Sequence, residues 1–183
     1  TVTLTITDHG CTESYIDDVW VPIDPTLDPS IFPAIGCPPV FGTFNAVAQS
    51  NTQLFYEWNF GDGTGSFQPE NLHIYNTPGT YDVSLMVYTT TGCIDTLYQS
   101  MNNAIVVHPL PNAGFSITPQ TVDILSPNTN ISDLSTGGIT CAYSMSDGGT
   151  SSECNFPYEW TEAGIQTITQ TVTNEYGCID QAT

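Results

Sequence analysis

Apolar and polar residues alternate along three segments of the chain, and each segment ends in Gly-Cys. The segments read TVTLTITDHGC at 1–11, YDVSLMVYTTTGC at 81–93 and QTITQTVTNEYGC at 166–178. An alternation of period two predicts a half-buried β-strand, and the Gly-containing turn at its end predicts a hairpin. Gln170 interrupts the apolar face of the third copy. The terminal Cys residues are 82 and 85 residues apart, the size of one small β-sandwich.

Two Pro-rich stretches, VPIDPTLDPSIFP and VVHPLPNAGF, lie between the copies, and Pro both ends sheet pairing and stiffens a linker. We therefore expect residues 1–27 to be the C-terminal strands of a preceding repeat and 28–110 to be a complete domain. Residues 111–183 are expected to be a divergent domain that stops before its last strand. Because no amphipathic helix is predicted anywhere, the expected fold class is all-β.

The charge balance excludes several classes of partner. The chain has 19 acidic residues, no Lys and no Arg, for a formal net charge of -19. Binding to DNA, RNA or anionic lipid is excluded because counterion release requires Lys or Arg. No apolar run reaches the roughly 18 residues of a membrane span, so direct membrane insertion is not expected. Six Cys without a CxxC pair favour an oxidising compartment and an extracellular location.

A cluster of aromatic, Gly and acidic residues lies in the centre of the chain, in Tyr56-Glu-Trp-Asn-Phe-Gly-Asp-Gly-Thr64. Trp58 and Phe60 share one face of the predicted strand and are expected to fill a core, while Gly61, Asp62 and Gly63 supply a tight turn. Asp62 is interpreted as a turn residue that satisfies its own backbone. His73 is interpreted as a packing residue and not as a catalyst.

These residues together resemble the polycystic-kidney-disease (PKD) domain, whose pattern is W-x-F-G-D-G-T, then H-x-Y and P-G-x-Y-x-V. The positions that carry the resemblance are Trp58, Phe60, Gly61, Asp62, Gly63, His73, Tyr75, Gly79 and Tyr81. The resemblance implies tandem immunoglobulin-like β-sandwich domains in an extracellular array. The third repeat departs from the pattern, with Tyr143-Ser-Met-Ser-Asp-Gly148 and Tyr158-Glu-Trp160 at the corresponding places.

The Gly-Cys hairpins and the Thr/Asn-rich style also resemble PKD-like repeats of giant surface proteins in Bacteroidota, including gliding-motility adhesins exported by type IX secretion. That resemblance implies attachment at the bacterial cell surface through a long repetitive arm. Asp95-Thr96-Leu97 resembles the short O-glycosylation sequon of those bacteria, so Thr96 is a candidate modification site.

Two disulfides are expected. Cys141 and Cys154 lie symmetrically about Asp147-Gly148, which makes a cross-strand bridge geometrically reasonable. Related bacterial PKD repeats imply a second bridge between Cys37 and Cys93, although six Cys permit 15 full pairings. The partner of Cys11 is expected upstream. Cys178 is expected to be a free thiol or to pair downstream.

Ligand chemistry has few candidates in this sequence. Calcium favours oxygen ligands, and a group at or near the first junction offers carboxylates: Asp17, Asp18, Asp24 and Asp28. The alternative, a solvated acidic surface with diffuse counterions, is favoured because no D-x-D-x-D-G loop is present. Trp20, Tyr98 and Trp160 are candidates for stacking on sugar rings, and the competing interpretation places each Trp in a core or a junction.

No catalytic residues and no cofactor other than calcium are expected, because the sequence lacks a nucleophile elbow, a paired-carboxylate signature and zinc spacing. The chain is therefore interpreted as a structural or adhesive repeat segment of a large secreted protein. Its expected partners are neighbouring repeats, extracellular polysaccharide and surface proteins. The alternative is an accessory module of a secreted protease or polysaccharide-degrading enzyme.

Overall fold

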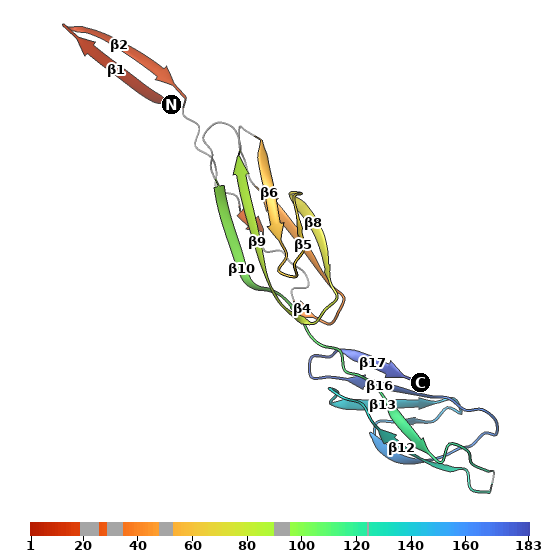
Figure 1. Ribbon diagram of the computed structural model, residues 1–183. Coiled ribbons are helices and arrows are strands. Elements are labelled where there is room, and N and C mark those ends of the chain that lie inside the picture. The colour runs from red at the N-terminus through yellow and green to blue at the C-terminus, as the bar shows by residue number, and fades with distance from the viewer. Residues whose placement is uncertain (19–25, 29–34, 48–52, 90–95, 124) are drawn as a thin grey trace. The chain divides into compact units, whose positions relative to one another are not determined.

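The described residues of the chain fold into β-strands joined by turns (Figure 1). The computed structural model describes residues 1–183 except 19–25, 29–34, 48–52, 90–95 and 124. The described part contains no helix long and apolar enough to cross a membrane. The all-β prediction is confirmed, and the sheets pair into immunoglobulin-like sandwiches.

Spatial contacts divide the described residues into two compact units. The first comprises Thr1–Phe32, Thr43–His73 and Tyr81–Ala104, and the second comprises Pro33–Gly42, Ile74–Thr80 and Ile105–Thr183. The central strands contribute segments to both units. The domain boundaries expected at 27 and 110 remain predictions.

The central sandwich consists of two sheets. The five-stranded sheet has the order β4-β10-β9-β6-β7 and the three-stranded sheet has the order β3-β5-β8. Their bounds are β3 Thr26–Asp28, β4 Ile35–Gly36, β5 Val40–Val47, β6 Leu54–Asn59, β7 Gly65–Ser66, β8 Glu70–Tyr75, β9 Gly79–Thr89 and β10 Thr96–Val107.

An aromatic cluster fills the space between these two sheets. The ring of Phe44 on β5 lies 5.5 Å from that of Trp58 on β6 and 5.1 Å from that of Phe60. All three side chains are at most 3% exposed. Alternate residues of β9 complete the core, with Val83, Leu85 and Val87 buried. The predicted burial of Trp58 and Phe60 is therefore confirmed, and it follows from the period-two pattern of both strands.

The C-terminal sandwich packs the sheet β11-β12-β15 against the sheet β14-β13-β16-β17. Tyr143 on β13 is its central aromatic residue, 5.2 Å from the ring of Phe156 on β15 and 5.9 Å from Phe115 on β11. The strands are β11 Phe115–Thr118, β12 Asn128–Asp133, β13 Thr140–Met145, β14 Thr150–Ser151, β15 Asn155–Glu159, β16 Ile168–Thr173 and β17 Ile179–Ala182.

Gln170, the polar residue on the apolar face of β16, is fully buried. Its Nε2 donates to Oδ1 of Asp133 at 2.7 Å and to the hydroxyl of Tyr143 at 2.8 Å. Both hydrogen bonds satisfy the amide nitrogen, as buried polar groups require, while Oε1 has no hydrogen-bond partner among the described residues. The interruption in the sequence pattern therefore marks a polar link between β16, β12 and β13, and the strand itself continues.

The N-terminal hairpin joins β1 (Val2–Asp8) to β2 (Cys11–Asp17) in the register Val2↔Asp17 to Asp8↔Cys11. The hairpin prediction is confirmed, but the half-buried prediction for its first strand is not, since Val2, Leu4 and Ile6 are each more than half exposed. Within the described residues, β1 and β2 form a sheet with each other alone. A two-stranded ribbon has no second layer to bury its apolar face.

The core assignment predicts a contrast between two Phe→Ala substitutions. Phe44 is 1% exposed and Phe67 is 73% exposed. Phe44→Ala is expected to lower the free energy of unfolding by about 3–5 kcal/mol because it removes a buried ring and leaves a cavity. Phe67→Ala is expected to change it by less than about 0.5 kcal/mol. Chemical denaturation followed by circular dichroism measures both, and equal effects would refute the core assignment.

Candidate functional site

The turn after β6 is fixed by a three-residue cluster, which we call the Asp62 clamp: Asp62, Thr64 and His73. Oδ1 of Asp62 accepts hydrogen bonds from the backbone N–H of Thr64 at 3.0 Å and from its hydroxyl at 2.6 Å. Oδ2 lies 2.7 Å from Nε2 of His73 on β8. The clamp therefore ties the turn between β6 and β7, in one sheet, to β8 in the other. The interpretation of Asp62 as a turn residue is consistent with these contacts.

Two glycines give this turn its shape. Gly61 and Gly63 have φ values of +83° and +89°, a region that L side chains rarely adopt. At Gly61 an added Cβ would also overlap the backbone carbonyl oxygen of Asp82. The Gly-Asp-Gly order is thus a backbone requirement.

The Asp62 clamp does not have the geometry of a nucleophilic triad. In such a triad the acid and the nucleophile bind opposite nitrogens of the imidazole. Here Oδ2 of Asp62 and Oγ1 of Thr64 both approach Nε2 of His73, at 2.7 Å and 3.3 Å. The imidazole also stacks on Phe60, with ring centroids 4.4 Å apart. The arrangement orients His73 as a packing and hydrogen-bonding residue.

The pKa of the Asp62 carboxyl is held below its ordinary value. Desolvation acts to raise it, but the hydrogen bonds from Thr64 and His73 together outweigh that effect. The carboxyl therefore remains an acceptor-only anion to lower pH than a free Asp, which suits its part in the turn.

The C-terminal sandwich contains a corresponding cluster, the Asp147 clamp, made of Asp147, Tyr158 and Thr161. Oδ1 of Asp147 accepts a hydrogen bond from the Tyr158 hydroxyl at 2.6 Å, and Oδ2 accepts from the N–H and the hydroxyl of Thr161. These hydrogen bonds, with that of Tyr158 foremost, lower the pKa of Asp147. Burial and the adjacent carboxylate raise the pKa of Tyr158 to about 12.

The C-terminal sandwich has Tyr158 where the central sandwich has His73, and a glycine leaves room for the larger side chain. Tyr158 takes the place in the Asp147 clamp that His73 has in the Asp62 clamp, and its longer side chain reaches the carboxylate directly. A Cβ added at Gly149 would overlap the Tyr158 hydroxyl. In the central sandwich Thr64 follows the turn, and its hydroxyl binds both Asp62 and His73. The two clamps are alternative ways of filling the same space.

The disulfides differ in part from those expected. Cys141 and Cys154 are joined, as predicted from their symmetry about the turn. Cys37 is joined to Cys178 and not to Cys93, so the expected Cys37–Cys93 pairing is wrong, and so is the expectation that Cys178 is free or pairs downstream. Cys93 itself lies outside the described residues. Cys11 is an exposed free thiol within the described part of the chain.

The pairing of Cys37 follows from the local strand arrangement within the second compact unit. β4, directly before Cys37, pairs in parallel with the end of β10, and Gly36 accepts a hydrogen bond from the N–H of His108 at 2.8 Å. The ring of His108 stacks on Tyr176, with centroids 3.8 Å apart. Asn174 donates to the carbonyl oxygen of Pro109 at 2.7 Å. These contacts hold the turn of Cys178 beside Cys37, and Cys178 is 1% exposed.

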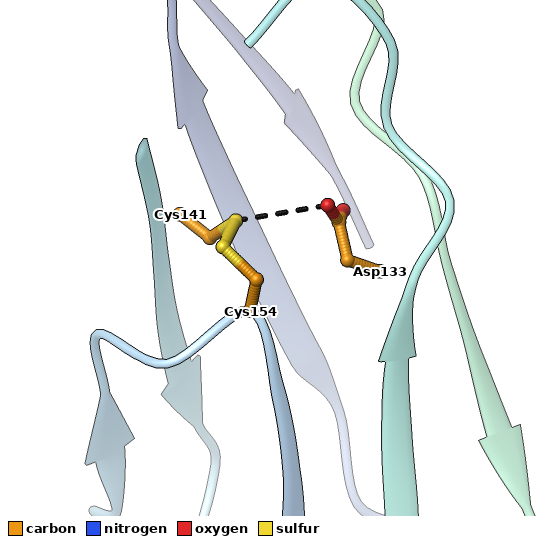
Figure 2. A group of neighbouring side chains, drawn as sticks. All are labelled: Asp133, Cys141 and Cys154. Atoms are coloured by element: carbon orange, nitrogen blue, oxygen red, sulfur yellow. Dashed lines mark hydrogen bonds between the residues drawn. A yellow bond between two sulfur atoms is a disulfide. The ribbon is translucent and has the colours of Figure 1, made fainter. Parts of the chain in front are cut away.

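One group of residues in the described part has a composition that suits a metal: Asp133, Cys141 and Cys154 (Figure 2). Both sulfurs are consumed in the disulfide, and a metal requires thiolates. Oδ2 of Asp133 lies 3.8 Å from Sγ of Cys141. Its Oδ1 accepts from the N–H and hydroxyl of Ser135 and from Gln170. The oxidised cluster is thus a structural junction whose residues do not fit a metal ion.

The carboxylates considered for calcium are only partly described. Asp17 and Asp18 are exposed at the end of β2, where the N–H of Asp18 donates to Oδ1 of Asp17. Asp24 lies outside the described residues, and only the backbone of Asp28, the last residue of β3, is described. Calcium binding stays a prediction. Thr96 is exposed at the start of β10, so a modification there is sterically open.

A groove of about 540 Å³ opens in the C-terminal sandwich. Its floor is formed by Ile117, Thr129 and Ile168, and its wall includes Trp160. The rim carries polar side chains from two loops: Gln120, Thr121, Asp123, Thr161, Glu162 and Gln166. Thr129 is 3% exposed, and its hydroxyl has no hydrogen-bond partner among the described residues. A lining of aromatic and apolar side chains with a few polar groups is typical of a small-molecule site.

Of the aromatic residues proposed for sugar stacking, Trp160 lines this groove. It also packs against the core of the C-terminal sandwich, with its ring 5.0 Å from that of Tyr158, as the competing interpretation expected. Tyr98 is 68% exposed on β10, and Trp20 lies outside the described residues. The groove itself was not predicted, because its lining comes from separate loops whose approach has no local sequence signal.

Comparison with known proteins supports the assignment of the central segment. Residues 25–104 match the family model of the PKD domain. A solved structure described as "Structures of Clostridium thermocellum CbhA fibronectin(III)-like modules" is 12% identical, with 86% of this chain and 90% of that chain covered. The TM-score is 0.30. Residues 25–104 of this all-β chain are thus similar to the PKD domain.

The Asp62 clamp predicts a pH-dependent loss of stability in acid. Because the folded pKa of Asp62 is below the unfolded value of about 3.9, its stabilisation is present above that value and is lost as pH falls through the folded pKa. Asp62→Asn should therefore be less stable than the wild type at pH 5, with a difference that shrinks toward pH 2–3. Denaturant titrations across this range measure the difference.

The matched variant for this measurement is Thr64→Val, which keeps the branched shape but removes one donor to Asp62. It should show the same trend with a smaller difference at pH 5. A difference between wild type and Asp62→Asn that stays constant or grows toward acid would contradict the role assigned to the carboxylate.

Proposed function

We propose that this chain is a structural segment of a larger extracellular protein, an adhesin stalk or filament, and that it performs no catalysis. One observation carries the proposal: the residues with shifted pKa values serve the fold. Enzymes concentrate such residues in clefts. In the described part of the chain they are Asp62, Asp133, Tyr143, Asp147, Tyr158 and Tyr176, and none of them lines the groove.

The causes of these shifts support the same conclusion. The three Asp pKa values are lowered by hydrogen bonds within turns and between strands. The Tyr143 and Tyr158 values are raised by burial, and the Tyr176 value by its hydrogen bond with Glu175. For Asp62, Asp133 and Asp147, the hydrogen bonds that lower the pKa are therefore also contacts of the fold.

Tandem organisation is supported by the two clamps, whose acidic residues are 85 residues apart, as are Cys93 and Cys178. The PKD match supports an accessory or structural module. Disulfides persist in oxidising compartments, which supports an extracellular location.

We extend the proposal to a Bacteroidota cell-surface protein exported by type IX secretion and used in gliding motility or attachment. The partners are then neighbouring repeats and extracellular polysaccharide or surface proteins.

Whole cells that carry the full-length protein provide the test. Antibodies raised against this 183-residue chain should label intact, unpermeabilised cells, and an in-frame deletion of the segment should reduce attachment to surfaces. Labelling that requires permeabilised cells would refute surface exposure. Antigen found only in the medium together with protease or polysaccharide-degrading activity would favour the accessory module of a secreted enzyme.

The groove at Trp160 favours a second function, contact with a neutral carbohydrate. A net charge of -19 repels anionic sugars, whereas the carboxylates of Asp123 and Glu162 and the amide of Gln120 suit sugar hydroxyls. The ring of Trp160 offers an apolar surface to a pyranose face. The unpartnered Thr129 hydroxyl at the groove floor offers one further hydrogen bond.

Carbohydrate contact predicts that Trp160→Ala weakens binding of neutral oligosaccharides at least about tenfold, or about 1.4 kcal/mol. A glycan array identifies the ligand, and calorimetry with the intact chain measures the affinity. Tyr98→Ala is the control, since Tyr98 is an exposed aromatic residue that does not line the groove. Equal losses in both variants, or no binding by the wild type, would refute this second function.

A further inference from the structure

The disulfide between Cys37 and Cys178 closes a loop with a sequence separation of 141 residues. Nearly the whole folded part of the chain lies inside that loop. Among the described residues, every buried apolar side chain from Val40 to Val172 lies between the two Cys. Both aromatic clusters, around Trp58 and around Tyr143, are therefore enclosed.

Few elements of the described part of the chain lie outside the loop. On the N-terminal side they are β1, β2, β3 and β4, and on the C-terminal side β17 follows Cys178. Of these, β3, β4 and β17 pair with strands inside the loop, through β5, β10 and β16. A pull on the two ends of the chain can peel these short strands, and it then reaches the sulfur–sulfur bond.

We propose that the Cys37–Cys178 disulfide carries tension through this segment and so shields both sandwiches from force. A β-sandwich yields to force by breaking hydrogen bonds and apolar contacts. A disulfide opens only through covalent chemistry such as thiol exchange. Tension that enters before Cys37 and leaves after Cys178 passes from one sulfur to the other. The strands and cores between them bear none of it.

The shielding has a consequence for recovery. An enclosed sandwich that opens thermally has its ends held together, because the Cα atoms of Cys37 and Cys178 are 5.5 Å apart. It therefore refolds without working against the load. The length of the segment under tension stays constant. The mechanical claim follows from the disulfide connectivity alone, and its use in a stalk rests on the function proposed above.

Single-molecule pulling on the full 183-residue chain tests the proposal. Handles are attached at both ends, and Cys11→Ser is used throughout to prevent exchange with the free thiol. The oxidised chain should show no unfolding event from the enclosed sandwiches. Reduction before pulling should release about 490 Å of additional contour length, from a separation of 141 residues at roughly 3.5 Å each.

The reductant is a water-soluble phosphine. The phosphine becomes its oxide with an oxygen atom from water, and the two sulfurs gain two electrons and two protons to become thiols. Cys178→Ser should release about 450 Å without reduction, because the Cys141–Cys154 bond still closes a separation of 13 of the 141 residues at roughly 3.5 Å each. The paired variant Cys141→Ser with Cys154→Ser should remain as inextensible as the oxidised chain, since both residues lie inside the loop that Cys37 and Cys178 close.

Three outcomes would overturn the proposal. Unfolding steps of the sandwiches in the oxidised chain would show that they carry the load, and an identical trace after reduction would show that no disulfide does. If reducing the bond at Cys37 released only about 200 Å of contour length, Cys37 would instead be joined to Cys93, a separation of about 56 residues. Surface labelling of cells is independent of all three, so failure of the stalk function and failure of the load path are distinguishable.

Discussion

The absence of Lys and Arg determines how this protein stabilises its carboxylates. An ionised Asp in a folded chain needs donors, and here backbone N–H groups, hydroxyls, an amide and an imidazole supply them. Asp62, Asp133 and Asp147 each receive two or more such hydrogen bonds. Short polar side chains near turns are suited to this task because they reach the carboxylate with little loss of side-chain entropy. Hydroxyl groups of Thr and Ser thus donate the hydrogen bonds that Lys and Arg side chains supply in other proteins.

Because Lys and Arg are absent, the stability of the fold depends on its cores and its disulfides. Exposed ion pairs contribute little to stability in any protein, so their loss costs little. The aromatic residues between the sheets and the polar link through Gln170 act in their place. A disulfide that encloses a long loop restricts the unfolded chain more than one that encloses a short loop. The two bonds of this chain differ tenfold in sequence separation, and the longer one unites residues of a single compact unit.

Sequence alone predicted the parts of the structure that are determined by residues close together in the chain. The period-two pattern predicted the burial of Trp58 and Phe60. The Gly-Asp-Gly sequence predicted that Asp62 is a turn residue, because tight turns have characteristic residue types. The Cys141–Cys154 bridge could be predicted because a hairpin places its flanking residues opposite each other. The partner of Cys178 could not be predicted in this way. Its partner depends on the parallel pairing of β4 with β10 and on the stacking of His108 on Tyr176, and neither has a local signal.

The relation between Gly149 and Tyr158 has a consequence for how such repeats diverge. A Thr at 149 would overlap the phenol unless the Tyr158 side chain moved away from Asp147. The residue types at 149 and 158 are thus coupled through the space that they share. We expect repeats that diverge at this turn to replace both residues together.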